Sequence, residues 1–182
     1  MPGAEWETFD EVLGVRWAGA DITYTQSVDL YFGDEVIFEY HPGPSAGTTW
    51  VNIPSKKVIF IGDTVLPSQP PFLANADLPA WVDTLGELLK SYRDYKIVGG
   101  RGGLITLEDI NNQQKHLKKI MRSLERLAKR NAAPESIEGL IVNLLSDHSF
   151  PAKLKGLYTS RYKHGLYQYY VRRYRPSDAS GE

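Results

Sequence analysis

The feature that most constrains this chain is a run of four apolar residues from Val58 to Ile61 with no polar residue between them. Successive residues of a strand point to opposite faces of a sheet, so a run without alternation is typical of a strand that is buried on both faces. Gly62-Asp63 ends the run, and a proline-rich loop follows. We therefore predict a central strand at residues 57–61, in a sheet that is covered on both sides.

The segments around this strand indicate a mixed α/β (α+β) fold, with helices on one face of the sheet and a helical C-terminal extension. Thr106 and Asp109 have the spacing of a capping box, which predicts that a long helix begins there. Alternating or β-branched segments predict strands at residues 21–30, 35–41, 48–53 and 95–98. Apolar residues at helical spacing predict the remaining helices at residues 4–13, 77–92, 134–145 and 151–174. We divide the chain into a half domain (1–132), the helical extension (133–175) and a flexible tail (176–182).

Composition excludes several classes of function. The chain has 182 residues and no cysteine, so it has no disulfide, thiolate metal site or cysteine nucleophile. No apolar run approaches the roughly 20 residues that span a bilayer, and the N-terminus lacks the pattern of a secretory signal. We therefore expect a cytoplasmic protein that does not enter membranes.

Charge is distributed unevenly, although the formal net charge is -1. Residues 1–40 carry nine carboxylates and one cation, whereas residues 149–177 carry seven cations, six tyrosines and no carboxylate. Interleaved cations and aromatic rings can bind single-stranded nucleic acid, and oppositely charged ends of two chains can also meet. Most of these tyrosines share one helical side with leucines, so we expect that side to pack against the body of the protein or a partner rather than against nucleic acid.

Three motifs, in this order, resemble the second half of the metallo-β-lactamase superfamily. That family has a loop Gly-His-Ser/Thr-x-Gly-Ser/Thr, then a strand ending in Gly-Asp, and later a strand ending in Gly-His-Gly. The resemblance covers about residues 20–130 and implies half of an αβ/βα sandwich. The matching segments here are Gly43-Pro44-Ser45-Ala46-Gly47-Thr48, Val58-Ile59-Phe60-Ile61-Gly62-Asp63-Thr64 and Val98-Gly99-Gly100-Arg101-Gly102.

The resemblance also implies a metal site, and most of its ligands are missing. The family binds zinc through a first-half motif His-x-His-x-Asp-His and through the histidine, aspartate and histidine of these three segments. The first-half motif is absent, and the two later histidines are replaced by Pro44, which has no donor atom, and Arg101, a permanent cation. Only Asp63 remains as a matching metal ligand, whereas a catalytic zinc needs about three. We expect the site to be vacant and assign no catalytic residue.

The surviving residues have alternative interpretations. Asp63 is either a former ligand that keeps a role or a strand-end carboxylate bonded to the next loop. Arg101 either pairs with Asp63 in place of the lost cation or lies exposed in its glycine loop, where Gly100, Arg101 and Gly102 could also bind a small anion. His41 could be a stray ligand or base, although a lone histidine is more often simply hydrogen-bonded. We assign no role to His116, which we place on the polar side of its helix, or to His148.

These observations lead to two hypotheses. The first is a non-catalytic, metal-free structural or interaction module without a cofactor. Because half of the family's sandwich leaves one sheet face bare, we expect that face to be covered by a homodimer partner or by the missing N-terminal half. The second is the C-terminal fragment of a longer metal-dependent hydrolase, whose N-terminal half supplies the His-x-His-x-Asp-His ligands for zinc.

Overall fold

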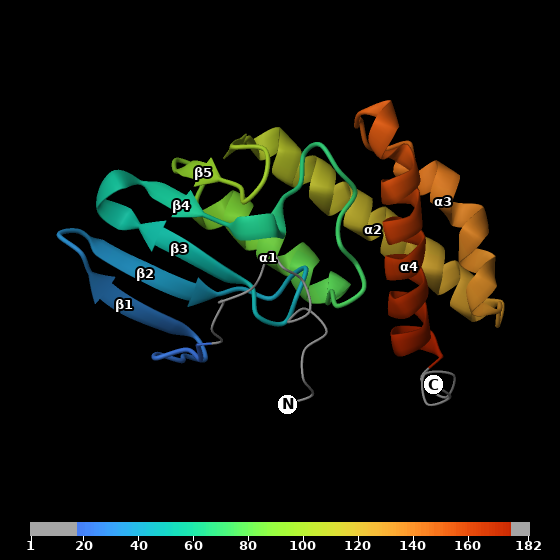
Figure 1. The fold of residues 1–182 in the computed structure, drawn as a ribbon, viewed down its shortest axis with the longest axis horizontal. Coiled ribbons are helices and arrows are strands. Elements are labelled where there is room, and N and C mark those ends of the chain that lie inside the picture. Colours follow the sequence, from blue (N-terminus) through green and yellow to red (C-terminus); the bar gives the residue numbers. More distant parts are fainter. Residues whose placement is uncertain (1–17, 176–182) are drawn as a thin grey trace, which may run out of the picture.

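The computed structural model describes residues 18–175, which form a six-stranded sheet with four α-helices (Figure 1). The predicted helix at 4–13 and the predicted tail at 176–182 lie outside the described residues. The strands are β1 (Ser27–Tyr31), β2 (Glu35–Tyr40), β3 (Thr49–Ile53), β4 (Val58–Phe60), β5 (Lys96–Val98) and β6 (Leu104–Ile105). The helices are α1 (Leu78–Ser91), α2 (Leu107–Lys129), α3 (Glu138–Leu145) and α4 (Lys155–Tyr174). Single 3-10 turns lie at Pro54–Lys56, Gly62–Thr64, Pro134–Ile137 and Ala152–Leu154.

The sheet follows chain order from β1 to β6. All neighbouring strands are antiparallel except β4 and β5, which are parallel and joined through α1. The mixed α/β fold predicted from the sequence is confirmed. β1 starts later than predicted, at Ser27, and β6 was not predicted because two residues carry no periodic signal.

The helix starts follow the capping residues. The Asp77 side chain accepts a hydrogen bond from the Ala80 N–H at 3.1 Å, which caps α1. At the start of α2, the Asp109 N–H donates to Thr106 Oγ1 at 3.1 Å and the Thr106 N–H donates to Asp109 Oδ2 at 2.9 Å. This reciprocal pair is the predicted capping box.

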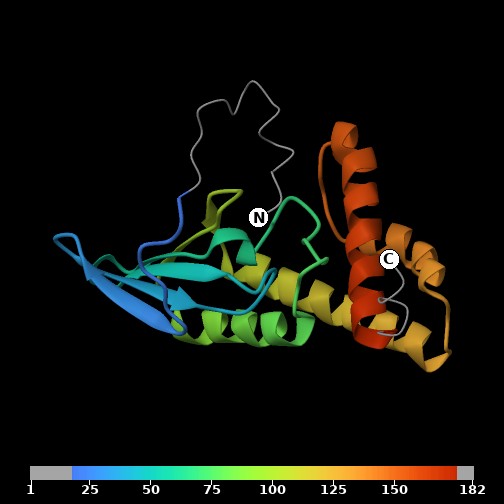
Figure 2. The same ribbon diagram turned by 60° about the horizontal axis from the view of Figure 1, so that its bottom comes forward.

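The main core lies between the sheet and α1 and α2, which sit on one side of it (Figure 2). Thr64 links the sheet to α1. The indole N–H of Trp50, on β3, donates to the Thr64 hydroxyl, and the indole N–H of Trp81, on α1, donates to the Thr64 carbonyl, both at 2.9 Å. The helical extension continues the same core, with Tyr162 and Tyr170 buried. The apolar side of α4 therefore packs against the body of the protein.

Several cations of the extension bond within the chain. Arg172 donates to the backbone carbonyls of Ala74 and Ala76, and Arg175 donates to the carbonyl of Ala132. Lys163 pairs with Glu138. These contacts give the basic residues a packing role. Within residues 18–175, no helix is both long and apolar enough to cross a bilayer.

Candidate functional site

Asp63 and Arg101 lie together at one edge of the sheet. Asp63 follows β4 and Arg101 follows β5, and the carboxyl ends of two parallel neighbours meet at the same edge. Arg101 Nε is 3.3 Å from Asp63 Oδ1. The guanidinium carbon also lies 5.2 Å from the centroid of the Phe72 ring. Of the two alternatives for Arg101, the structure has the ion pair with Asp63, and because the two side chains are 56% and 31% exposed, water weakens it.

The glycine loop brings the backbone close to this pair. A Cβ atom on Gly100 would lie 3.0 Å from Asp63 Oδ1 and 3.1 Å from the Gly62 backbone, so a side chain there would need these neighbours to shift. The Gly100 N–H donates to the Gly62 carbonyl at 2.7 Å, and the Gly99 N–H donates to the Gly103 carbonyl at 2.8 Å. These two amides are therefore already bonded within the chain. Anion binding by Arg101 and Gly102 stays a prediction.

His41 lies between the sheet and α1 and does not contact Asp63 or Arg101. It stacks on Trp50 with ring centroids 3.7 Å apart, and its nitrogens are 3.9 Å from Glu39 and 3.8 Å from Glu87. Burial lowers the pKa of His41, while the two carboxylates act in the opposite direction. These contacts indicate a packed core histidine. Pro44 is partly buried in the loop before β3 and contributes no polar side-chain atom.

The face of the sheet opposite α1 and α2 is apolar, and no helix or strand of residues 18–175 covers it. Strand register aligns one residue from each strand across this face: Val28, Phe38, Val51, Phe60, Val98 and Leu104. None of the six is buried, and Phe60 and Leu104 are 42% and 68% exposed. Burial of the second face of β4, which we expect from a partner or from the missing half of the fold, is not provided by residues 18–175 and stays a prediction. Within β4 only Ile59, which faces the helices, is fully buried, because residues 18–175 place no helix or strand on the other side.

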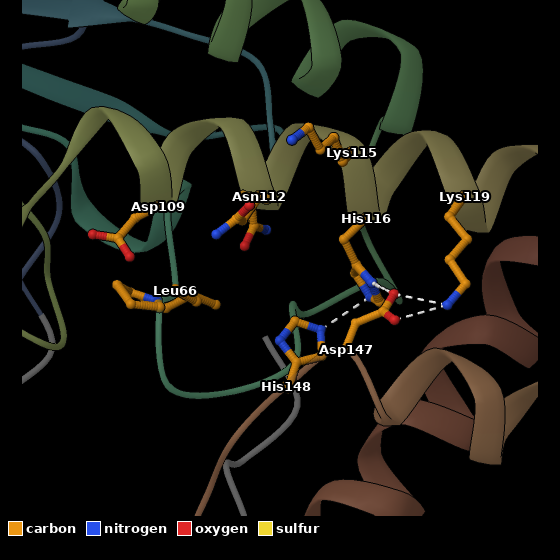
Figure 3. Close-up of a pocket in the computed structure, with 10 residues that line it drawn as sticks. Leu66, Asp109, Asn112, Lys115, His116, Lys119, Asp147 and His148 are labelled. Atoms are coloured by element: carbon orange, nitrogen blue, oxygen red, sulfur yellow. Dashed lines mark hydrogen bonds and ion pairs between the residues drawn. The ribbon is translucent and has the colours of Figure 1, made fainter.

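A second polar cluster, which we call the histidine cluster, joins α2 to the segment after α3. It consists of His116, Lys119, Asp147 and His148, which Figure 3 shows, and of Tyr162 from α4. His116 Nδ1 is 2.8 Å from Asp147 Oδ2, and His116 Nε2 is 2.7 Å from the Tyr162 hydroxyl and 3.0 Å from His148 Nε2. Lys119 Nζ donates to both Asp147 oxygens at 2.8 and 2.9 Å.

Sequence reasoning missed this cluster. We placed His116 on the polar side of its helix, whereas it is 4% exposed. Helical spacing could have indicated that His116 is buried. It lies three residues after buried Gln113 and four before buried Ile120, on the stripe of α2 that faces the core. Nothing local in the sequence links His116 to His148, which is 32 residues away.

A cavity of about 450 Å³ opens beside the histidine cluster. Leu66 and Pro67, from the loop after Asp63, supply apolar wall, and the rest comes from α2 and the segment after α3. Gln113 lines it as well and is 4% exposed. The polar residues of the wall are Asp109, Asn112, Gln113, Lys115, His116, Lys119, Asp147 and His148.

Comparison with known proteins finds relatives only among solved structures, since no family model and no curated protein matches the chain. A double mutant of the sec-alkyl sulfatase PisA1 superimposes on 91% of this chain with a TM-score of 0.64 and 14% identity. The stereoselective inverting sec-alkylsulfatase Pisa1 from Pseudomonas sp. gives a TM-score of 0.62 over 88% of the chain, also at 14% identity. A metallo-β-lactamase from Pontibacter korlensis gives 0.50 over 56% of the chain at 21% identity. The chain has part of the metallo-β-lactamase fold.

Only part of that fold is present. The chain spans 28% of the alkylsulfatase chains and 50% of the Pontibacter korlensis enzyme. Its match to the alkylsulfatases covers nearly all of this chain, so the helical extension belongs to the similarity as well. Identities of 14–21% show the fold alone.

The residues at this edge do not fit the metal ions that bind to the metallo-β-lactamase fold. Of the three matching positions, only Asp63 has a metal-binding side chain, and the cationic Arg101 Nε lies 3.3 Å from it. Within residues 18–175, no three histidine, cysteine, aspartate or glutamate side chains are grouped so that they could hold a metal ion. The Arg101 guanidinium places a positive charge beside Asp63.

Proposed function

We propose that this chain is a metal-free, non-catalytic interaction module that docks the open face of its sheet onto a second copy of itself. The observation that carries the proposal is the apolar row across all six strands. A row of this length on one face is typical of an interface, because single exposed apolar residues are scattered on ordinary surfaces.

The geometry of the row favours a second sheet as the partner. Two sheets pack face to face about 10 Å apart, with side chains from both inner faces interdigitating. A two-fold axis near β3 and β4 would bring Val51 and Phe60 of one chain against the same residues of the other, so one surface serves both partners. The metallo-β-lactamase resemblance implies the same kind of packing, since that family places two sheets face to face.

Light scattering after size exclusion tests the proposal. We expect a species of twice the 20.5 kDa chain mass at micromolar concentration. Phe60→Asp places a charge in the centre of the row and should give a folded monomer, because Phe60 is 42% exposed and lies outside the core. Leu157→Asp, on α4 and 51% exposed, is the matched control and should remain dimeric. A monomeric parent chain, or a Phe60→Asp variant that stays dimeric, contradicts the proposal.

A second candidate follows from the partial span of the relatives. The chain corresponds to 28% of one relative and 50% of another, which favours a fragment of a longer protein, and the order of the three motifs favours the C-terminal part of a metal-dependent hydrolase. Its N-terminal half would then cover the open face and supply the His-x-His-x-Asp-His motif. Sequencing the reading frame upstream of Met1 tests this candidate. An in-frame stop codon directly upstream contradicts it, and the motif in frame supports it.

A further inference from the structure

A small pocket lies where the glycine loop meets the helical extension. Its volume is about 200 Å³, and Arg101 and Gly102 form the part of its wall that is next to the Asp63–Arg101 pair. The rest of the wall comes from the loop after Asp63, from Pro151 and from Tyr158 of α4. We call this space the arginine pocket. It is distinct from the larger cavity beside the histidine cluster, although the loop after Asp63 lines both.

The arginine pocket has an apolar wall. Leu66, Pro67 and Pro151 contribute hydrocarbon to it, and Tyr158 contributes its ring. The Tyr158 hydroxyl donates to Gln69 Oε1 at 3.1 Å, so its proton is already used within the chain. This wall is therefore suited to the hydrocarbon part of a ligand.

Two arginines from distant parts of the chain meet at one aromatic ring beside this pocket. The guanidinium carbon of Arg101 lies 5.2 Å from the centroid of the Phe72 ring, and that of Arg161, on α4, lies 4.0 Å from it. Arg161 follows Tyr158 by three residues, so both lie on one face of α4 and Arg161 is next to the pocket. The ring attracts each cation, but two cations at one ring also repel each other.

Residues 18–175 leave the charge at this ring unbalanced. Asp63 pairs with Arg101 through Nε at 3.3 Å, whereas no carboxylate of these residues pairs with Arg161. Lys163, on the same helix, shows the contrast, because it pairs with Glu138. None of the described residues that line the pocket is acidic. Two guanidinium groups and one carboxylate leave one positive charge, which a single monoanion would neutralise.

We infer that the arginine pocket binds a small organic monocarboxylate, whose carboxylate pairs with Arg101 and Arg161 and whose hydrocarbon part lies on the apolar wall. A guanidinium presents its N–H donors in a planar fork that matches the two oxygens of a carboxylate. A phosphate dianion fits less well, because it would leave excess negative charge beside Asp63. This inference extends the anion binding predicted for the glycine loop and does not depend on the docking of the sheet face.

NMR titration of the whole chain with benzoate, benzamide and inorganic phosphate tests the class of ligand. Benzoate and benzamide have nearly the same shape and differ in charge, whereas phosphate carries charge without hydrocarbon. We expect benzoate to shift the Gly102 amide and the Arg101 and Arg161 side-chain signals saturably, and the other two probes to bind roughly tenfold or more weakly. The inference is overturned by no saturable shift with benzoate, by equal or tighter binding of benzamide or phosphate, or by shifts confined to residues outside the pocket.

A matched pair of arginine substitutions tests the site itself. Arg161→Gln removes the cation that lacks a carboxylate and should weaken benzoate binding about fivefold or more. Its Tm should stay within about 2 °C of the parent, because the side chain is exposed. Arg173→Gln removes a cation from an exposed position of the same helix, outside the pocket, and should bind benzoate as the parent does. Unchanged affinity in Arg161→Gln overturns the inference, and so do equal losses in the two variants, which would show only a general attraction of anions to a basic helix.

Discussion

The two polar clusters of this protein differ in exposure and in what holds them. The Asp63–Arg101 pair lies at the sheet edge, more than half exposed on the arginine side, and consists of one contact at 3.3 Å. The histidine cluster is built around the buried imidazole of His116, whose partners at 2.7 to 3.0 Å come from the segment after α3 and from α4. The pair at the sheet edge is thus the weaker cluster, and the stronger polar network lies around His116, outside the three motifs.

The largest expected effect in this comparison comes from Asp147→Ala. It leaves the buried His116 N–H without its acceptor and Lys119 without its partner, which should lower the free energy of unfolding by about 2–3 kcal/mol. Asp94→Ala is the matched control, because Asp94 also pairs with a lysine but both side chains are more than 60% exposed. We expect the control to change stability by less than about 0.5 kcal/mol in urea denaturation. Equal effects of the two substitutions would show that the histidine cluster contributes no more than a surface pair.

An intermediate effect is expected on the pH dependence of stability. The folded pKa values of His116 and His148 lie below the ordinary value of about 6.5, so the unfolded chain binds more protons than the folded one in that range. Stability should be complete above about pH 6.5 and decline as the pH falls toward 4, where His148 protonates in the folded state. His148→Leu should decline less steeply over this window than the parent, and Arg101→Ala should follow the parent. If His148→Leu and the parent have the same slope, His148 is not buried in its neutral form.

The smallest expected effect is that of Arg101→Ala. The pair it removes is exposed to water, so the free energy of unfolding should change by less than about 1 kcal/mol. Urea denaturation of this variant beside Asp147→Ala gives the contrast directly. A loss above about 2 kcal/mol would place the edge pair on a level with the histidine cluster and remove the distinction between them.

The sequence predicted the elements whose signals are local. The capping box at Thr106 and Asp109, the N-cap at Asp77 and the central strand all depend on residues a few positions apart. The Asp63–Arg101 pair was also predictable, because family motifs fix the ends of two strands and parallel neighbours bring those ends together.

What sequence reasoning missed depends on long-range packing. The lack of alternation at Val58 to Ile61 correctly indicated a strand with two apolar faces, but it carried no information on whether residues 18–175 would cover both. His116 and His148 meet only because α2 and α3 pack with their connecting segments in a particular register. The sequence places Gln113 on the apolar stripe of α2 for the same reason without showing its contacts. A polar residue at such a position does not reveal whether its side-chain amide finds a hydrogen-bond acceptor in the folded chain.

The central claim is that a cationic side chain has replaced the metal at Asp63, and metal analysis of the purified chain tests it most directly. We expect the protein, expressed with added zinc and iron, to contain far less than one equivalent of either metal, and zinc to leave its Tm unchanged. One equivalent of zinc or iron that is retained through purification and lost in Asp63→Ala would contradict the claim.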